Sequence, residues 1–322
     1  MDYLLSLYVN FCFEIMLNRR ILRIKAFKAV YCYAENPGMT LRDLEAYLDQ
    51  SCESTRDLYL FLLSIVGPLT EEARSRIEAS RTKFNPTDEE LHPNMKFTEN
   101  RIAALLAQDP DFTKLISRKK LSWEQYDMLL RHLYETVRER KYFKDYLASE
   151  ERSVAEDARL WIHIFEREFE DNQDLWDILE DLSMFWSDDL PYALIWCCRT
   201  LQSIADGNGW SLLPLYQSDL KGNEMHESDK VFVTGIVRKA YANYDKYYQA
   251  VAECTPKWDK NRICATDLSL IVCGLAEADA FPHIGYRTTI NEYVEISKFY
   301  STPESRGFVN GLLDKLINKS TI

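Results

Sequence analysis

The sequence predicts an all-α fold. Only 10 of the 322 residues are glycine and 10 are proline, so few residues interrupt long stretches rich in Leu, Glu, Lys, Arg and Ala. Apolar residues recur in these stretches at helical spacing, as at Ile24, Phe27 and Tyr31. No stretch shows the alternation of apolar and polar residues that indicates a half-buried strand.

In the N-terminal part, the pattern predicts three successive helices. They cover residues 18–34, 40–50 and 54–66. Thr40 begins the second helix and Asp43 stands three residues later, which approximates a capping box. Gly67 and Pro68 are expected to end the third helix, and residues 84–97 form a polar loop that contains proline.

Helical periodicity resumes beyond residue 97 and continues to a glycine-rich turn at 206–209. The apolar stripes of this middle region include Trp123, Tyr126, Leu130, Leu133 and Val137 in one helix, and Leu175, Ile178, Leu179, Leu182, Phe185 and Trp186 in another. The last third is expected to contain helices over 231–252, 267–277 and 286–299 and a final helix. Ser301 and Glu304 read as the capping box of that final helix, with Pro303 in its first turn.

The sequence contains no signature of an enzyme, cofactor or metal site. P-loop, GxGxxG, HExxH and GxSxG motifs are absent. The acidic stretch from Glu166 to Asp189 fits a solvated helix face, and the eight cysteines contain no CxxC pair, which favours reduced thiols in a cytoplasmic protein. The longest apolar run, 58–66, is far shorter than the roughly 20 residues of a membrane span. We therefore expect a cytoplasmic, non-enzymatic protein without a membrane segment, metal or cofactor.

A cluster of positive charge stands near the N-terminus of an otherwise acidic chain. The formal net charge is −12, yet Arg19, Arg20, Arg23, Lys25 and Lys28 lie within ten residues that contain no acid. Guanidinium groups at this spacing suit adjacent RNA phosphates, so we expect the three arginines to be exposed and to bind RNA. Composition alone would equally allow a solubilising helix face.

Two motifs at opposite ends of the chain resemble the NusB family. The N-terminal motif is Arg19-Arg20-x-x-Arg23 followed by Ala29-Val30-Tyr31. The C-terminal run from Thr288 to Leu316 contains Ile290-Asn291-Glu292 and the final FVNGLLDKL segment from Phe308. The resemblance covers about 18–50 and 228–318, whereas residues from about 55 to 220 have no counterpart in the short members and indicate a long variant with a helical insertion.

The resemblance implies a fold and a function. NusB proteins fold as two small helical bundles and bind boxA RNA of ribosomal operons together with NusE, a protein of the small ribosomal subunit, within an antitermination complex on RNA polymerase. Carried onto this sequence, the RNA-binding positions are Arg19, Arg20, Arg23, Glu304 and Phe308, and the partner-binding positions are Tyr31 and Asp267. We expect the start of the first helix, the 301–308 turn and the start of the Asp267 helix to lie close together.

Structural roles compete with several of these assignments. Phe308 could anchor the final helix, Tyr31 could pack in the core, and Asp267 could be a favourable charge at a helix N-terminus beside Thr266. Val272 stands where short members often carry a basic residue, which puts part of the usual RNA surface in doubt.

We expect three segments along the chain. They are an N-terminal extension over 1–17, whose first fifteen residues could come from an upstream start codon; a helical subdomain over 18–220, including the insertion at about 55–220; and a NusB-like bundle over 221–322.

Two other functions remain open. One is an accessory RNA-binding module, related to the N-terminal domain of RNA cytosine methyltransferases. The other is a helical protein–protein scaffold without an RNA role.

Overall fold

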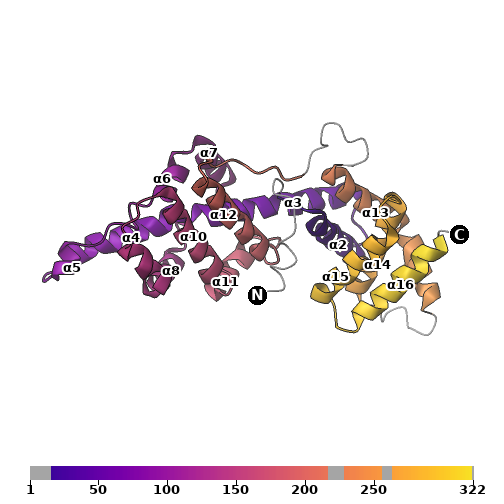
Figure 1. Ribbon diagram of the computed structural model, residues 1–322. Helices are drawn as coiled ribbons and strands as arrows, with labels where there is room; N and C mark the ends of the chain where they lie inside the picture. The colour runs from indigo at the N-terminus through magenta and orange to yellow at the C-terminus, as the bar shows by residue number, and fades with distance from the viewer. Residues whose placement is uncertain (1–15, 217–227, 256–262, 321–322) are drawn as a thin grey trace. The chain divides into compact units, whose positions relative to one another are not determined.

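A computed structural model describes residues 16–216, 228–255 and 263–320, and every regular element in these ranges is a helix (Figure 1). The predicted all-α class is confirmed. None of the described helices is long and apolar enough to cross a membrane. Of the expected N-terminal extension over 1–17, residues 1–15 lie outside the described residues, whereas Met16 and Leu17 are fully buried.

The chain forms two compact units, and their limits differ from the expected division at residue 220. Within the described residues, one unit is Ser54–Leu213, and the other combines residues 16–53 with those from Pro214. The first described helix, α2 (Arg19–Glu35), therefore belongs with the C-terminal helices rather than with the inserted ones. The reason is packing, because α2 lies against α13 (Asp229–Cys254), α14 (Ala265–Ala280) and α15 (Tyr286–Tyr300).

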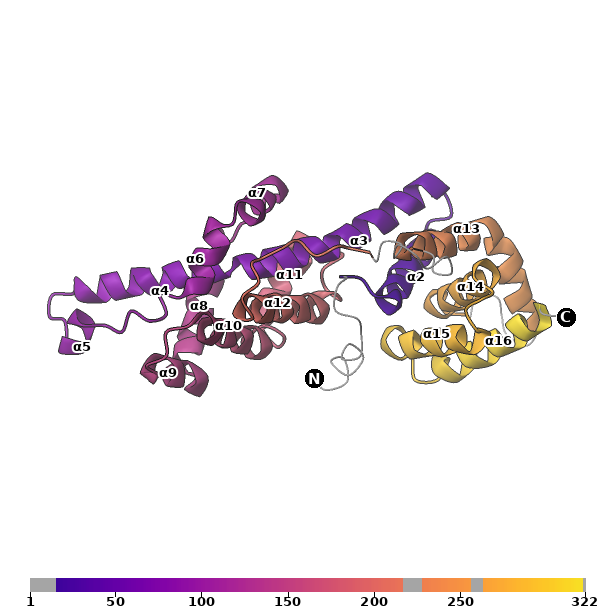
Figure 2. The ribbon, with the colours of Figure 1, turned by 45° about the horizontal axis from the view of Figure 1, so that its top comes forward.

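The unit that combines the N-terminal residues with those from Pro214 is called the family-like unit below. It is built around α14, which contacts α2, α13, α15 and the last helix, α16 (Ser305–Ser320) (Figures 1 and 2). Every residue of α14 from Asp267 to Glu277 is buried. Gly274 allows a close approach of α16, because a Cβ atom there would lie 2.7 Å from Cδ2 of Leu313 on that helix. This central helix therefore has neighbours on all sides, and any charge on it must find a partner inside the unit.

The inserted unit continues α3 and adds nine further helices within the described residues, packed around an aromatic core. Trp123 stacks on Phe61 at 4.0 Å between ring centroids, and Trp161 is fully buried. Its helices are α3 (Leu41–Ser64, shared with the other unit), α4 (Val66–Arg81), α5 (Asp88–Leu91), α6 (Arg101–Gln108), α7 (Pro110–Lys119), α8 (Asp127–Glu139), α9 (Lys141–Ala148), α10 (Val154–Glu168), α11 (Gln173–Leu182) and α12 (Leu190–Ala205).

Two predicted helix boundaries are wrong. The expected helices at 40–50 and 54–66 are one continuous helix, α3, and Gly67-Pro68 lies in the first turn of α4 instead of ending its predecessor. Proline is tolerated there because the first turn of a helix needs no backbone donor. The predicted cap of α3 is confirmed, since the Asp43 backbone N–H donates to Thr40 Oγ1 at 3.3 Å and the Thr40 N–H donates to Asp43 Oδ2 at 3.0 Å.

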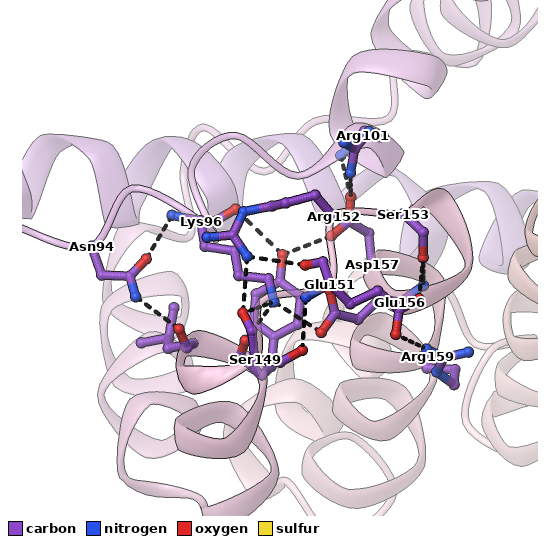
Figure 3. A network of polar contacts seen from close by, with 12 residues as sticks. Asn94, Lys96, Arg101, Ser149, Glu151, Arg152, Ser153, Glu156, Asp157 and Arg159 are labelled. Atoms are coloured by element: carbon purple, nitrogen blue, oxygen red, sulfur yellow. Dashed lines mark hydrogen bonds and ion pairs between the residues drawn. The ribbon is translucent and has the colours of Figure 1, made fainter.

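A buried lysine in the loop before α6 forms hydrogen bonds with the C-terminal end of α9 and with the first turn of α10 (Figure 3). The Lys96 ammonium donates to the backbone carbonyl oxygens of Tyr146 and Ser149, at 2.7 and 3.0 Å, and to Glu156 Oε1 at 2.8 Å. The Lys96 side chain is 1% exposed, so both charges of the ion pair are removed from water. Glu156 Oε2 is buried and has no hydrogen-bond partner among the described residues, so the stability of this pair depends on the hydrogen bonds that Lys96 donates.

Replacing Lys96 with Met is expected to destabilise the protein by about 3–5 kcal/mol, because it leaves a buried carboxylate and two carbonyl groups without a partner. Urea unfolding of the full chain measures this change. Lys144→Met is the matched control, since Lys144 pairs with Glu139 on the surface and should cost less than about 1 kcal/mol. Lys96→Met combined with Glu156→Leu should recover part of the loss. Equal stability of the Lys96 and Lys144 variants would contradict the burial account.

Candidate nucleic-acid and partner interface

The arginine cluster lies on the first two turns of α2. Asn18 caps this helix, because its side-chain oxygen accepts a hydrogen bond from the Ile21 N–H at 3.0 Å. Arg19, Arg20 and Arg23 then follow at positions that face α13, α15 and α14. Each arginine meets a carboxylate of one of these helices.

Arg23 forms a buried, bidentate ion pair with Glu277 of α14. Its Nε and Nη2 atoms donate to the two carboxylate oxygens at 2.8 and 2.7 Å. Thr289 Oγ1 and the Tyr293 hydroxyl donate to the same carboxylate at 3.0 and 3.1 Å. Burial alone would lower the pKa of Arg23, but the hydrogen bond and charge of Glu277 raise it above its ordinary value.

The other two arginines have weaker but similar partners. Arg20 donates to both carboxylate oxygens of Glu292, at 2.9 and 2.7 Å, and both side chains are 19% exposed. Arg19 Nε lies 3.4 Å from Asp229 Oδ1, and the Arg19 side chain is 31% exposed. The Arg19 guanidinium lies 4.6 Å from the centre of the Phe232 ring. Accessibility to solvent therefore falls from Arg19 to Arg20 to Arg23.

The expectation that all three arginines are exposed is wrong. The Arg23 side chain is only 6% exposed, and Lys25, in the same cluster, is buried as well. The side of α2 that carries these residues is covered by α13, α14 and α15, whose acids neutralise the arginines. Arg19 and Arg20 keep partial access to solvent, whereas Arg23 serves as an internal tether.

The second half of α2 carries aromatic and basic groups toward the end of α15. The Phe27 ring lies 5.3 Å from the Tyr300 ring, and the Lys28 ammonium lies 5.7 Å from the same ring. Tyr31, expected to bind a partner protein, is 38% exposed and contacts Phe27 at 6.4 Å. The Tyr31 side chain therefore lies at the surface and not in the core.

The turn between α15 and α16 is held by Asp267. Ser301 Oγ and Ser305 Oγ donate to its two carboxylate oxygens at 2.5 and 2.7 Å. The predicted Ser301–Glu304 capping box is wrong, because Ser301 bonds to another helix and α16 begins only at Ser305. Asp267 is 6% exposed, so a partner cannot reach much of it in this arrangement.

Contacts between α2 and α15 link two of the segments that were expected to form one surface, the start of α2 and the 301–308 turn. Arg20 meets Glu292 and Lys28 meets Tyr300, so α2 and α15 run side by side in the same direction. At 1.5 Å per residue, about 12 Å of helix axis separates Arg20 from Lys28. Tyr300 adjoins the turn that carries exposed Glu304, and that turn is bonded to Asp267. Half-buried Phe308 follows in the first turn of α16.

Sequence reasoning missed the acids that pair with the arginines. Glu277 is the clearest signal in retrospect, because it follows the apolar run LSLIVCGLA and a charge on a buried helix requires a partner. Glu292 belongs to the Ile290-Asn291-Glu292 motif, which was recognised only as a landmark. Periodicity does not show which basic residue meets which acid when 254 residues separate them.

Comparisons with known proteins match the same unit. The NusB family model matches residues 202–318, which include α13 to α15 and most of α16. A protein of Alkaliphilus oremlandii is 30% identical over 95 residues, which are 30% of this chain and 69% of that protein. The chain belongs to the NusB family.

Further relatives agree with this assignment. A Natranaerobius thermophilus protein is 28% identical over 96 residues, covering 30% of this chain and 69% of its own length, and a Bacillus mycoides protein is 29% identical over 113 residues, covering 32% and 87%. All three relatives are named transcription antitermination protein NusB. No solved structure matches the chain. Within the part of the chain that the structure describes, no group of side chains could hold a metal ion.

The Arg20–Glu292 pair predicts a pH dependence of stability. Burial would raise the pKa of Glu292, but the hydrogen bond from Arg20 and the charges of Arg23 and Arg20 outweigh it and lower the pKa below its ordinary 4.5. A carboxyl group whose pKa is depressed by folding stabilises the fold above its unfolded pKa, and this contribution is lost as the pH falls through the folded pKa. As the pH is lowered below 4.5, we expect the urea concentration at the unfolding midpoint to decrease more steeply for the wild type than for Glu292→Gln. Parallel profiles for the two proteins would show that Glu292 gains nothing from its partners.

Proposed function

We propose that this protein is a non-enzymatic, RNA-binding transcription antitermination factor. It acts on boxA-type RNA of ribosomal operons together with NusE, as part of the antitermination complex on RNA polymerase. Family membership and the names of the relatives support the antitermination role. The single observation that supports the RNA contact is the pair of partly exposed guanidinium groups of Arg19 and Arg20 at the start of α2. They begin a strip of basic and aromatic side chains on this helix that continues to Lys28 and Tyr31.

In this proposal, RNA phosphates meet Arg19 and Arg20, and bases reach the Phe308 ring in the first turn of α16. Single-stranded RNA suits such a strip, because positive groups follow its backbone and aromatic rings stack on its bases. Exposed Glu304 lies in the turn before α16, where an acid can accept hydrogen bonds from base edges. Arg23 contributes indirectly by fixing α2 against α14.

The carboxylates that neutralise the arginines set the affinity. A phosphate must compete with Glu292 for Arg20 and with Asp229 for Arg19, so the intrinsic affinity for RNA is expected to be modest. NusE would raise it by covering acidic surface and by adding contacts of its own. Exposed Tyr31 is the best placed of the proposed partner-binding residues, whereas Asp267 would act through the turn that it holds.

Replacing Arg19 and Arg20 together with Gln, while keeping Arg23, tests the RNA contact. Two lost phosphate contacts should reduce the log–log salt slope of binding to a boxA-like strand by about 1.4, at roughly 0.7 per contact. Fluorescence anisotropy at several salt concentrations, with and without NusE, measures slope and affinity. Circular dichroism should show a folded protein, because the buried Arg23–Glu277 pair is retained.

The matched control is Arg238→Gln with Lys246→Gln, which removes the same charge from exposed positions of α13 in the same unit. The control should keep the wild-type slope. If the Arg19/Arg20 variant binds RNA with unchanged affinity and slope, α2 has no RNA role and the protein–protein scaffold becomes the better description.

A further inference from the structure

The inserted unit carries a second concentration of positive charge, on α7 and the residue after it. Lys114, Arg118, Lys119 and Lys120 lie within seven residues, and the segment from Phe112 to Trp123 contains no acid. Asp111, in the first turn of α7, is the nearest acid along the helix. This local charge stands out in a chain with a net charge of −12.

α7 is fixed at two points, and these determine which way its cations face. The Phe112 ring packs edge-on against Trp210 at 5.1 Å, and Lys119 pairs with Asp57 of α3 at 2.6 Å. Thr113 and Ile116 line a cavity of about 730 Å³ toward α4 and α8. At 100° per residue, Lys114 and Arg118 share the opposite face of the helix, where both are exposed.

Lys120 occupies a backbone position that favours glycine. Its φ of 55° and ψ of 37° are left-handed, and among the residues that the structure describes it alone combines a side chain with a positive φ. The turn is a helix end of the Schellman type, in which the Leu121 N–H donates to the Ile116 carbonyl at 3.1 Å. A lysine there carries a conformational cost that glycine would avoid, and in return it presents a third exposed cation beside Arg118.

These three cations differ from the arginines of α2 in one respect. Arg19, Arg20 and Arg23 each face a carboxylate, whereas Lys114, Arg118 and Lys120 form no ion pair with any residue in the described ranges. An incoming phosphate would not have to displace an acid from them. The favourable interaction of cations with a helix C-terminus accounts for Arg118 and Lys119 in the last turn, but not for Lys114.

We propose that Lys114, Arg118 and Lys120 form a second contact surface for the RNA backbone, on the inserted unit. The inference rests on the proposed RNA-binding function and extends it. The surface would read phosphates without base specificity, so it would hold RNA beyond the segment that the family-like unit recognises. The insertion then supplies positive charge that the arginine cluster, neutralised by its own acids, does not.

The test replaces Lys114 and Arg118 with Gln and Lys120 with Gly in the full chain. Glycine suits the left-handed position, so the variant should fold at least as stably as the wild type. With a long single-stranded RNA as the probe, the salt slope should fall by about 2 and the affinity near 0.1 M salt should drop on the order of a hundredfold, at about fivefold per contact. The control Arg138→Gln, Lys144→Gln and Arg159→Gln removes the same charge from exposed positions of the same unit and should leave the slope unchanged.

A second readout separates this proposal from that for α2. Bound RNA should protect Lys114 and Lys120 from acetylation, measured by mass spectrometry, also in the Arg19/Arg20 variant. If the Arg19/Arg20 variant loses affinity for boxA RNA while RNA still protects Lys114 and Lys120 from acetylation, the result supports both proposals. An unchanged slope in the α7 variant, or equal acetylation with and without RNA, would overturn the inference and leave α7 as a solvated face or a surface for an acidic protein. Those results would not touch the Arg19/Arg20 contact.

Discussion

The Glu277 carboxylate, buried at the centre of the family-like unit, needs four hydrogen bonds to exist there as a charge. Arg23 supplies two of them, and Thr289 and Tyr293 supply the others. Taking both ions out of water costs several kcal/mol each, and only a bidentate geometry with every acceptor site used can offset that cost. The requirement brings α2, α14 and α15 to one point and in one register. The rest of the unit, including the positions of Arg19 and Arg20, depends on this arrangement.

The same constraint shapes what the unit can bind. Because Arg23 is used internally and Arg20 is shared with Glu292, the motif that looks most basic in the sequence shows only part of its charge to solvent. In the proposed function, the partly neutralised surface would make a weak, salt-sensitive contact with RNA that a partner protein would strengthen. Among the described residues, Lys114, Arg118 and Lys120 have no such acid as a partner, so the proposed surface on the insertion would add electrostatic attraction to RNA. Acidic surface elsewhere would keep nonspecific binding low.

The sequence predicted the helices well, because apolar spacing of three to four residues is a local signal. It was less informative where a local pattern had two interpretations. Gly67-Pro68 can end a helix, but proline also suits a helix start, as in α4. Ser301 can cap a helix, but Asp267 of another helix offers the better acceptor. The candidate site followed the same division: the Arg19, Arg20 and Arg23 motif was visible, but its burial was not, since the partners of the arginines come from distant helices. The sequence does not predict the α7 surface, because local patterns do not show whether its cations are exposed or whether they pair with acids among the described residues.

The most direct test of the central constraint is a double-mutant cycle on Arg23 and Glu277, measured by urea unfolding of the full chain. Arg23→Met and Glu277→Gln should each destabilise the protein by about 3–5 kcal/mol, because each leaves a buried charge without its partner. The double variant should cost clearly less than the two single changes together, with a coupling energy of about 1–3 kcal/mol. Additive effects, or single variants as stable as the wild type, would contradict the account and show that α2 is held to α14 by apolar packing alone.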